Sequence, residues 1–186
     1  MLGGRLQDGT LAHAAHNTGR LTVIPATADR YDQRMTEPVS DSVTIAADPQ
    51  TVYALITDLP TLASLAEEAY AMHWKKGSAA TPGAVFKGEN RNGSKSWATT
   101  CTVTHALPAQ RFAFDVKAAV LPIAHWRYDI AATDGGCTVT ESTWDRRPGW
   151  FKKVAGLATG ISDRDGANAE HIRLTLQRLK ERAERG

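Results

Sequence analysis

Glu141 is the residue whose position in the sequence most directly suggests chemistry. It lies in a stretch with strand-like alternation, in which Cys137, Val139, Glu141 and Thr143 share one face and the first two are apolar. A carboxyl group on such a face points toward the protein interior, where burial raises its pKa. It could then act as an acid, as a base or as an anchor for a ligand hydroxyl group. Glu141 is therefore the single candidate catalytic residue.

An ion pair in water is the alternative for Glu141. Arg146 and Arg147 follow it closely in the sequence, and opposite charges near a strand end can pair at the protein surface. In that arrangement the carboxylate lies outside the interior and has an ordinary structural role. We prefer this interpretation, because ion pairs at strand ends are common, and keep the interior position as the competing hypothesis.

Large side chains on other predicted strands would surround the same interior. A concave apolar surface with a few hydrogen-bonding groups is typical of a small-molecule site. The alternative is a filled core, in which the aromatic rings only contact one another. The candidate ligand-binding residues are Tyr70, Met72, Trp74, Phe86, Asn90, Trp97, Thr99, Cys101, Phe112, Phe114, Trp126, Tyr128, Val139, Glu141 and Ile172.

Motifs for other kinds of chemistry are missing from the sequence. The six histidines are not spaced as zinc ligands, and His13 and His16 form an isolated pair near the N-terminus. Glycine-rich phosphate loops, a nucleophile elbow and a zincin helix are absent. Acidic residues between 163 and 170 are placed where they favour the start of a helix. The sequence therefore predicts no metal site and no cofactor.

Composition narrows the class of protein. The 186 residues are 42% hydrophobic and 23% charged, as in an ordinary globular protein, and the net charge is +2. Basic residues are spread along the chain, which argues against a nucleic-acid partner. No apolar stretch is long enough to span a bilayer and no secretory signal is present, so we expect a cytoplasmic protein. Cys101 and Cys137 are expected to be reduced and buried.

Periodicity and turn signals predict the elements that position these residues. Alternation predicts a strand at 39–45, and Asp48 followed by Pro49 predicts the start of a helix. A second short helix is predicted at 61–69. Six further strands are predicted at 70–76, 85–92, 95–107, 111–118, 124–132 and 137–144.

Two helices are predicted after the last strand. Residues 150–157 favour a short helix, and a longer one from Ile161 to Ala183 has a single apolar face, in which Asn168 also falls. Such a helix buries its apolar face on the concave side of a curved sheet. The predicted fold class is α+β, with an antiparallel sheet of about seven strands around a long C-terminal helix. Residues 1–36 are interpreted as a flexible extension and residues 37–186 as the folded domain.

Together with this order of elements, several short segments resemble one known group of proteins, the SRPBCC superfamily. It includes START lipid-transfer domains, the major birch pollen allergen and the polyketide cyclase/dehydrase family, and the similarity runs from about Val39 to Ala183. The segments that carry it are Phe86 to Gly93 (FKGENRNG), Trp97 to Val103 (WATTCTV), Arg111 to Val116 (RFAFDV), Trp126 to Tyr128 (WRY), Val139 to Glu141 (VTE), Arg146 to Trp150 (RRPGW) and Gly156 to Gly160.

The resemblance implies a helix-grip fold with a deep hydrophobic cavity between the sheet and the long helix. Members of the superfamily bind lipids, sterols, plant hormones or polyketides, and some cyclise or dehydrate polyketide chains. Their catalytic residues differ between subfamilies, so no residue role is carried over to this chain.

Three functions are compatible with the sequence. The first is binding or carriage of a small hydrophobic molecule. The second is a cyclase or dehydratase, in which Glu141, Tyr128, Asn90 and Thr99 polarise a carbonyl group and move protons. The third is a stress-related or regulatory partner-binding module. We rank them in this order, and the sequence makes no prediction about oligomeric state.

Overall fold

The computed structural model describes residues 37–186, apart from the side chain of Lys153. The expected flexible extension at residues 1–36 lies outside the described part of the chain. The strands are β1 (Val39–Ile45), β2 (Ala69–Lys76), β3 (Val85–Asn92), β4 (Lys95–Leu107), β5 (Arg111–Ala118), β6 (Leu121–Thr133) and β7 (Gly136–Asp145). The helices are α1 (Pro49–Thr57), α2 (Leu59–Leu65), α3 (Gly149–Thr159) and α4 (Arg164–Arg185).

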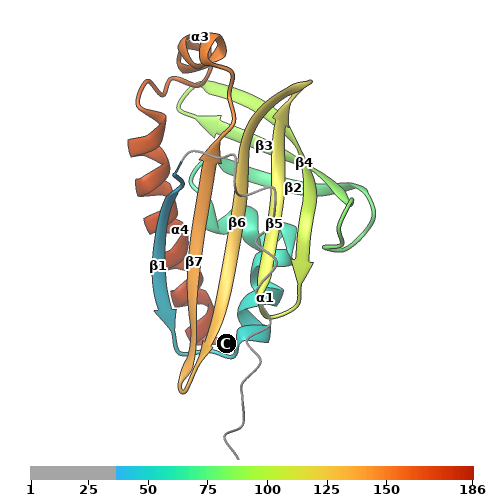
Figure 1. Cartoon of the computed structure of the whole chain (residues 1–186), viewed down its shortest axis with the longest axis vertical. Coiled ribbons are helices and arrows are strands. Elements are labelled where there is room, and N and C mark those ends of the chain that lie inside the picture. The colour runs from blue at the N-terminus through green and yellow to red at the C-terminus, as the bar shows by residue number, and fades with distance from the viewer. Residues whose placement is uncertain (1–36) are drawn as a thin grey trace, which may run out of the picture. The chain divides into compact units, whose positions relative to one another are not determined.

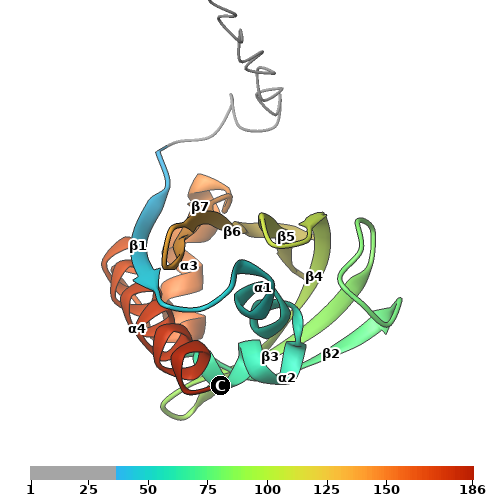
Figure 2. The same cartoon turned by 90° about the horizontal axis from the view of Figure 1, so that it is seen from below.

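The seven strands form one antiparallel sheet in the order β1-β7-β6-β5-β4-β3-β2. Strands β2 to β7 are consecutive neighbours, and β1 pairs with β7 at the edge. Helices α1, α2 and α4 all lie on the concave side of the curved sheet, with α4 against β1 and α2 against β2 (Figures 1 and 2). The predicted fold class is therefore confirmed, including the two short helices after the first strand.

Each of the two short helices α1 and α2 begins directly after an aspartate that caps its N-terminus. The Asp48 carboxylate accepts a hydrogen bond from the backbone N–H of Gln50 at 2.7 Å, as the sequence predicted. Asp58 does the same for Thr61 at 3.0 Å, so α2 begins at Leu59 and not at Thr61. Pro60 lies in the first turn of α2, where its missing N–H costs no hydrogen bond.

The two halves of α4 face the sheet with different side chains. In the C-terminal half, Leu176, Leu179 and Ala183 are buried and close the core. Closer to the N-terminus, α4 presents the polar Asn168 and Thr175 at buried positions, with the core residue Ile172 between them. The α4 side chains that border open space in the interior are those of four residues between Arg164 and Thr175.

Among residues 37–186, no helix is long and apolar enough to cross a membrane.

Candidate functional site

A cavity of about 250 Å³ lies between the sheet, the first half of α4 and the inner face of α3. Its apolar wall comes from Trp97, Phe114 and Trp126 on the sheet and from Phe151 and Ala155 on α3. A space of this size is close to the lower end of the range for small-molecule sites. The interior is therefore not a fully filled core.

Most of the predicted ligand-binding side chains line this cavity, and the remainder do not. Those that line it are Met72, Asn90, Trp97, Thr99, Cys101, Phe114, Trp126, Tyr128 and Glu141. Those that do not are Tyr70, Trp74, Phe86, Phe112, Val139 and Ile172.

Five of the residues outside the cavity belong to the packed core. Phe86, Phe112, Val139 and Ile172 are fully buried, and Trp74 packs against them at the edge of the cluster. The Phe86 ring meets Trp74 edge-on, with ring centroids 5.7 Å apart. For these residues the filled-core alternative is correct, because they face one another and not an open space.

The expected orientation of Tyr70 is wrong. The pairing of β2 with β3 shifts register between Ala69 and Ala71, so Tyr70 is the extra residue of a β-bulge. The bulge turns Tyr70 away from the face that carries Met72 and Trp74. Its side chain is exposed, and its hydroxyl group donates a hydrogen bond to Glu89 at 3.2 Å.

Glu141 is buried in the centre of β7, and the preferred ion-pair interpretation is wrong. Only 2% of the residue is exposed, and its Oε1 accepts a hydrogen bond from the Tyr128 hydroxyl group at 2.7 Å. Its backbone lies between Asp41 on β1 and Tyr128 on β6, away from the strand end. Burial raises the pKa of Glu141 to about 8, although the hydrogen bond from Tyr128 lowers it somewhat.

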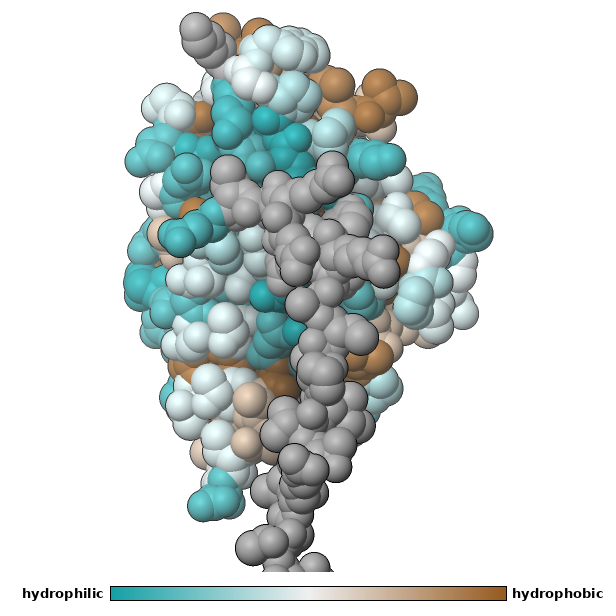
Figure 3. Space-filling view, in the orientation of Figure 1, coloured by the Kyte–Doolittle hydropathy of each residue, from teal (hydrophilic) through white to brown (hydrophobic). Residues whose placement is uncertain are grey.

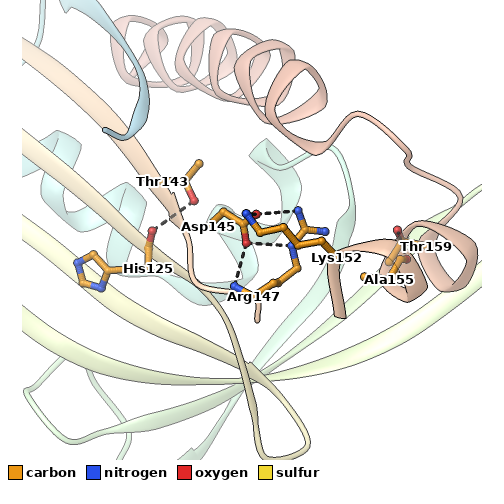
Figure 4. Close-up of polar contacts among 7 residues, drawn as sticks. All are labelled: His125, Thr143, Asp145, Arg147, Lys152, Ala155 and Thr159. Carbon is orange, nitrogen blue, oxygen red and sulfur yellow. Dashed lines mark hydrogen bonds and ion pairs between the residues drawn. The ribbon is translucent and has the colours of Figure 1, made fainter. Parts of the chain in front are cut away.

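The two arginines that were expected to pair with Glu141 bind aspartates. Arg147 donates to both carboxylate oxygens of Asp145, each at 2.9 Å, and Arg146 lies 2.8 Å from Asp115 (the Asp145 contacts are in Figure 4). Lys152 of α3 lies 3.0 Å from Asp145. Burial by itself would raise the pKa of Asp145, but these hydrogen bonds lower it to about 2. This charged cluster lies at the cavity wall, where Asp145 and Arg147 take part in the lining.

Thr143, which shares its strand face with Glu141 in the sequence, has its own partner. Its hydroxyl group donates to the carbonyl oxygen of His125 at 3.2 Å (Figure 4). It does not line the cavity. Glu141 is therefore the acidic group that β7 contributes to the deep part of the site.

Among the described residues that line the cavity, two buried polar atoms have no hydrogen-bond partner. They are Oε2 of Glu141 and Oδ1 of Asn168, and both residues line the cavity. A buried polar atom without a partner costs free energy, so such atoms call for a ligand or a water molecule. Sequence reasoning placed Asn168 on the apolar face of the long helix but missed its role in the site. A polar residue within an apolar stripe was the available signal.

Asn90 and Thr99 form a second polar group on another wall. The Asn90 amide donates to the Thr99 hydroxyl group at 3.3 Å, across the pair of strands β3 and β4. Gly88 keeps this corner open, because a β-carbon there would lie 2.8 Å from the Thr99 oxygen. Strand β5 separates this pair from β6, which carries Tyr128. The polar residues named from the sequence thus form two groups and not one.

An ion pair joins two elements at the cavity wall. Arg164, the first residue of α4, donates to both carboxylate oxygens of Glu68, at 2.8 and 2.7 Å. Both residues line the cavity, and the pair is only slightly exposed. It ties the start of α4 to the segment before β2 in a bidentate geometry.

The two cysteines are free and buried, as predicted. Burial raises the pKa of the Cys101 thiol to about 12 and also raises that of Cys137. Since the thiolate is the reactive form, we expect neither cysteine to react with Ellman's reagent at pH 8 in the folded protein, and both to react in guanidinium chloride. Rapid labelling of one thiol in the folded state would contradict the burial described here.

A family model described as polyketide cyclase / dehydrase and lipid transport matches residues 36–184. Among curated protein sequences, none is significantly similar to this chain.

Solved structures share the fold at low sequence identity. The Polyketide_cyc-like protein Cgl2372 from Corynebacterium glutamicum is 24% identical, with a TM-score of 0.53 over 78% of this chain and 91% of that one. StfQ, a di-domain ARO/CYC from the steffimycin biosynthetic pathway, is 12% identical, with a TM-score of 0.64 over 85% of this chain and 55% of that one. BexL, a di-domain ARO/CYC from the BE-7585A biosynthetic pathway, is 21% identical, with a TM-score of 0.60 over 81% of this chain and 50% of that one.

These neighbours support the fold, and the family model spans nearly all of the described residues. The predicted similarity is confirmed: the chain belongs to the polyketide cyclase/dehydrase and lipid transport family, within the SRPBCC superfamily.

Proposed function

We propose that the protein binds or carries a small, mostly apolar molecule, lipid or polyketide-like, that has a polar end directed toward Glu141. The observation that carries this proposal is the combination of an apolar cavity with the unpartnered Oε2 of Glu141 and Oδ1 of Asn168. Aromatic and aliphatic walls contribute affinity, whereas the few polar atoms orient the ligand.

The protonation state of Glu141 determines which chemical groups at the polar end of the ligand can form a hydrogen bond with it. At neutral pH the carboxyl group is mostly protonated, because its pKa is about 8. Oε1 then accepts from Tyr128, and Oε2 carries a proton that it donates to a ligand carbonyl or ether oxygen. Oδ1 of Asn168 accepts from a ligand hydroxyl group. A ligand with both a carbonyl and a hydroxyl group satisfies both atoms.

A fluorescent probe tests the cavity. We expect 1-aminoanthracene, an apolar and neutral fluorophore, to bind with one-to-one stoichiometry and to gain fluorescence. Ala158 lines the cavity and is exposed, so Ala158→Trp narrows its opening and is expected to weaken binding roughly tenfold. The control is Ala54→Trp, at an exposed position on α1 that does not line the cavity.

Equal probe affinity in both variants, or no binding by the unsubstituted protein, would contradict this proposal. Titration of fluorescence against probe concentration gives the dissociation constants directly.

A cyclase or dehydratase activity is the second candidate, and the raised pKa of Glu141 favours it. A neutral carboxyl group at pH 7 can protonate a leaving hydroxyl group, which departs as water, and the resulting carboxylate can take a proton from the neighbouring carbon. Native mass spectrometry of protein purified from its own host would identify a bound molecule. Incubation of that molecule with the protein and with Glu141→Gln separates carriage, which leaves it unchanged, from turnover, which the substitution abolishes.

A further inference from the structure

One face of α3 is apolar and exposed to solvent. Trp150, Val154 and Leu157 are spaced by four and three residues and so lie on the same side of the helix. Trp150 is 66% exposed and Leu157 is 78% exposed. Phe151 and Ala155, each one position further along the chain, lie on the adjacent face of α3 and line the cavity, and the Phe151 ring meets the Trp150 ring edge-on with centroids 5.6 Å apart. The helix therefore has two adjacent apolar faces, of which one lines the cavity and the other is largely exposed among the described residues.

The turn between β5 and β6 exposes another apolar side chain at the same end of the molecule. Val120 is 86% exposed, while Ala118 before it and Ile123 after it line the cavity. Figure 1 shows α3 and this turn at one end of the sheet, and Figure 3 shows hydrophobic residues gathered there. The backbone N–H of Arg146 donates to the carbonyl oxygen of Ile123 at 3.0 Å, which ties the approach to α3 to β6. Two exposed apolar elements thus flank one end of the cavity.

The charge of these two elements is positive. Residues 116–124 and 146–160 contain no acidic residue. Asp115 and Asp145 lie just before the two segments, the first bound by Arg146 and the second by Arg147 and Lys152, and these two carboxylates offset only part of the charge of the five basic residues. The basic residues of the two segments are Lys117, Arg146, Arg147, Lys152 and Lys153. Such a charge complements a negatively charged surface.

We propose that α3 and the β5–β6 turn dock together on an anionic lipid bilayer, with Trp150, Leu157 and Val120 inserted among the lipid chains. Tryptophan and aliphatic side chains beside basic residues are the combination that interfacial helices use on membranes. The apolar side chains project from two separate elements beside basic residues, which favours a deformable lipid surface over a protein partner. Docking in this orientation places the α3 end of the cavity against the bilayer. The inference goes beyond ligand binding and stands without it.

Sedimentation with vesicles tests the docking surface with the full chain. We expect the protein to pellet with vesicles of equal parts phosphatidylglycerol and phosphatidylcholine, and less with phosphatidylcholine alone or at high salt. Leu157→Glu and Val120→Glu are each expected to lower the partition coefficient roughly tenfold or more, because each inserts a charge where an apolar side chain was buried in lipid.

Leu107→Glu is the matched control. Leu107 is also an exposed leucine, at 47%, and lies at the end of β4, whose turn to β5 is at the opposite end of the sheet from the β5–β6 turn (Figure 1). We expect it to bind vesicles as the unsubstituted protein does. All three changes are at exposed positions, so circular dichroism should show unaltered folding.

Four results would overturn the proposal. The first is an unsubstituted protein that stays in the supernatant with anionic vesicles. The second is an equal loss of binding in Leu107→Glu. The third is an oligomer of the unsubstituted protein that Leu157→Glu dissociates, since the patch would then be an interface between copies of the chain. Loss of binding in Leu157→Glu alone, with Val120→Glu unaffected, would also contradict joint docking of the two elements.

Discussion

Replacing Glu141 with glutamine is expected to remove most of the fall in stability that the protein shows between about pH 5 and pH 8. The folded protein holds the Glu141 proton up to a pKa of about 8, whereas an unfolded chain releases it at its ordinary, lower pKa. The contribution of Glu141 to the free energy of unfolding is therefore fully present at low pH and is lost as the pH rises toward 8. The loss between pH 5 and pH 8 is on the order of 4 kcal/mol, since the free energy of unfolding falls by about 1.4 kcal/mol for each pH unit between the two pKa values.

Glutamine preserves the hydrogen bond that orients the site. Its amide oxygen accepts from the Tyr128 hydroxyl group as Oε1 of Glu141 does, at 2.7 Å in the parent protein. The substitution therefore removes the ionisation and keeps the packing. Urea unfolding at several pH values would give the free energy of unfolding of both proteins, and the difference between the two curves isolates Glu141.

A surface glutamate provides the control for this experiment. Glu170 is exposed, and the hydrogen bond from Arg173 lowers its pKa, so its titration lies below the pH range of interest. We expect Glu170→Gln to follow the parent curve between pH 5 and pH 8. Parallel curves for the parent protein and Glu141→Gln would show that Glu141 is ionised in the folded state, and would remove the support for its role as a proton donor.

Gly136→Ala is expected to destabilise the fold by about 3 kcal/mol or more. Gly136 begins β7 and has a φ of +150°, in the region that side chains with a β-carbon avoid. A β-carbon there would lie 2.1 Å from the carbonyl oxygen of Ile45 and 2.9 Å from the backbone nitrogen of Ala47. Because the end of β1 pairs with the start of β7 at this point, the backbone of both strands would have to move.

The neighbouring glycine is a matched control. Gly135 has no positive φ, and a β-carbon there would have no heavy atom within 4 Å. We expect Gly135→Ala to change the free energy of unfolding by less than about 1 kcal/mol. Urea denaturation of the two variants side by side is the measurement, and similar midpoints for the two would mean that the β1–β7 end relaxes at little cost.

The proposed ligand-binding cavity and the proposed membrane-docking surface are adjacent and can serve one function. The cavity requires a ligand that is mostly apolar, and such molecules dissolve in membranes better than in water. The exposed side chains of α3 and the β5–β6 turn lie at the end of the cavity that Ala118, Ile123 and Phe151 line. A protein that docks there would receive or deliver its ligand without passing it through water.

The order and type of the elements could be predicted from local sequence patterns. Strand alternation predicted that Phe112, Phe114, Trp126 and Tyr128 face inward, and all four are on the inner face of the sheet. Helix caps such as Asp48 were readable because a cap depends on residues only a few positions apart. These features are local, so the chain specifies them without reference to distant contacts.

Long-range packing determines which inward side chains contact one another and which line the cavity. Phe86 and Phe112 are core residues while Phe114 lines the cavity, although all have the same alternation. The bulge at Tyr70 reversed one orientation, because register depends on the partner strand. Glu141 is buried because β1 and β6 flank the middle of β7, and its pKa reflects that burial. Contacts between residues far apart in the chain set each of these outcomes, and local periodicity carries no information about them.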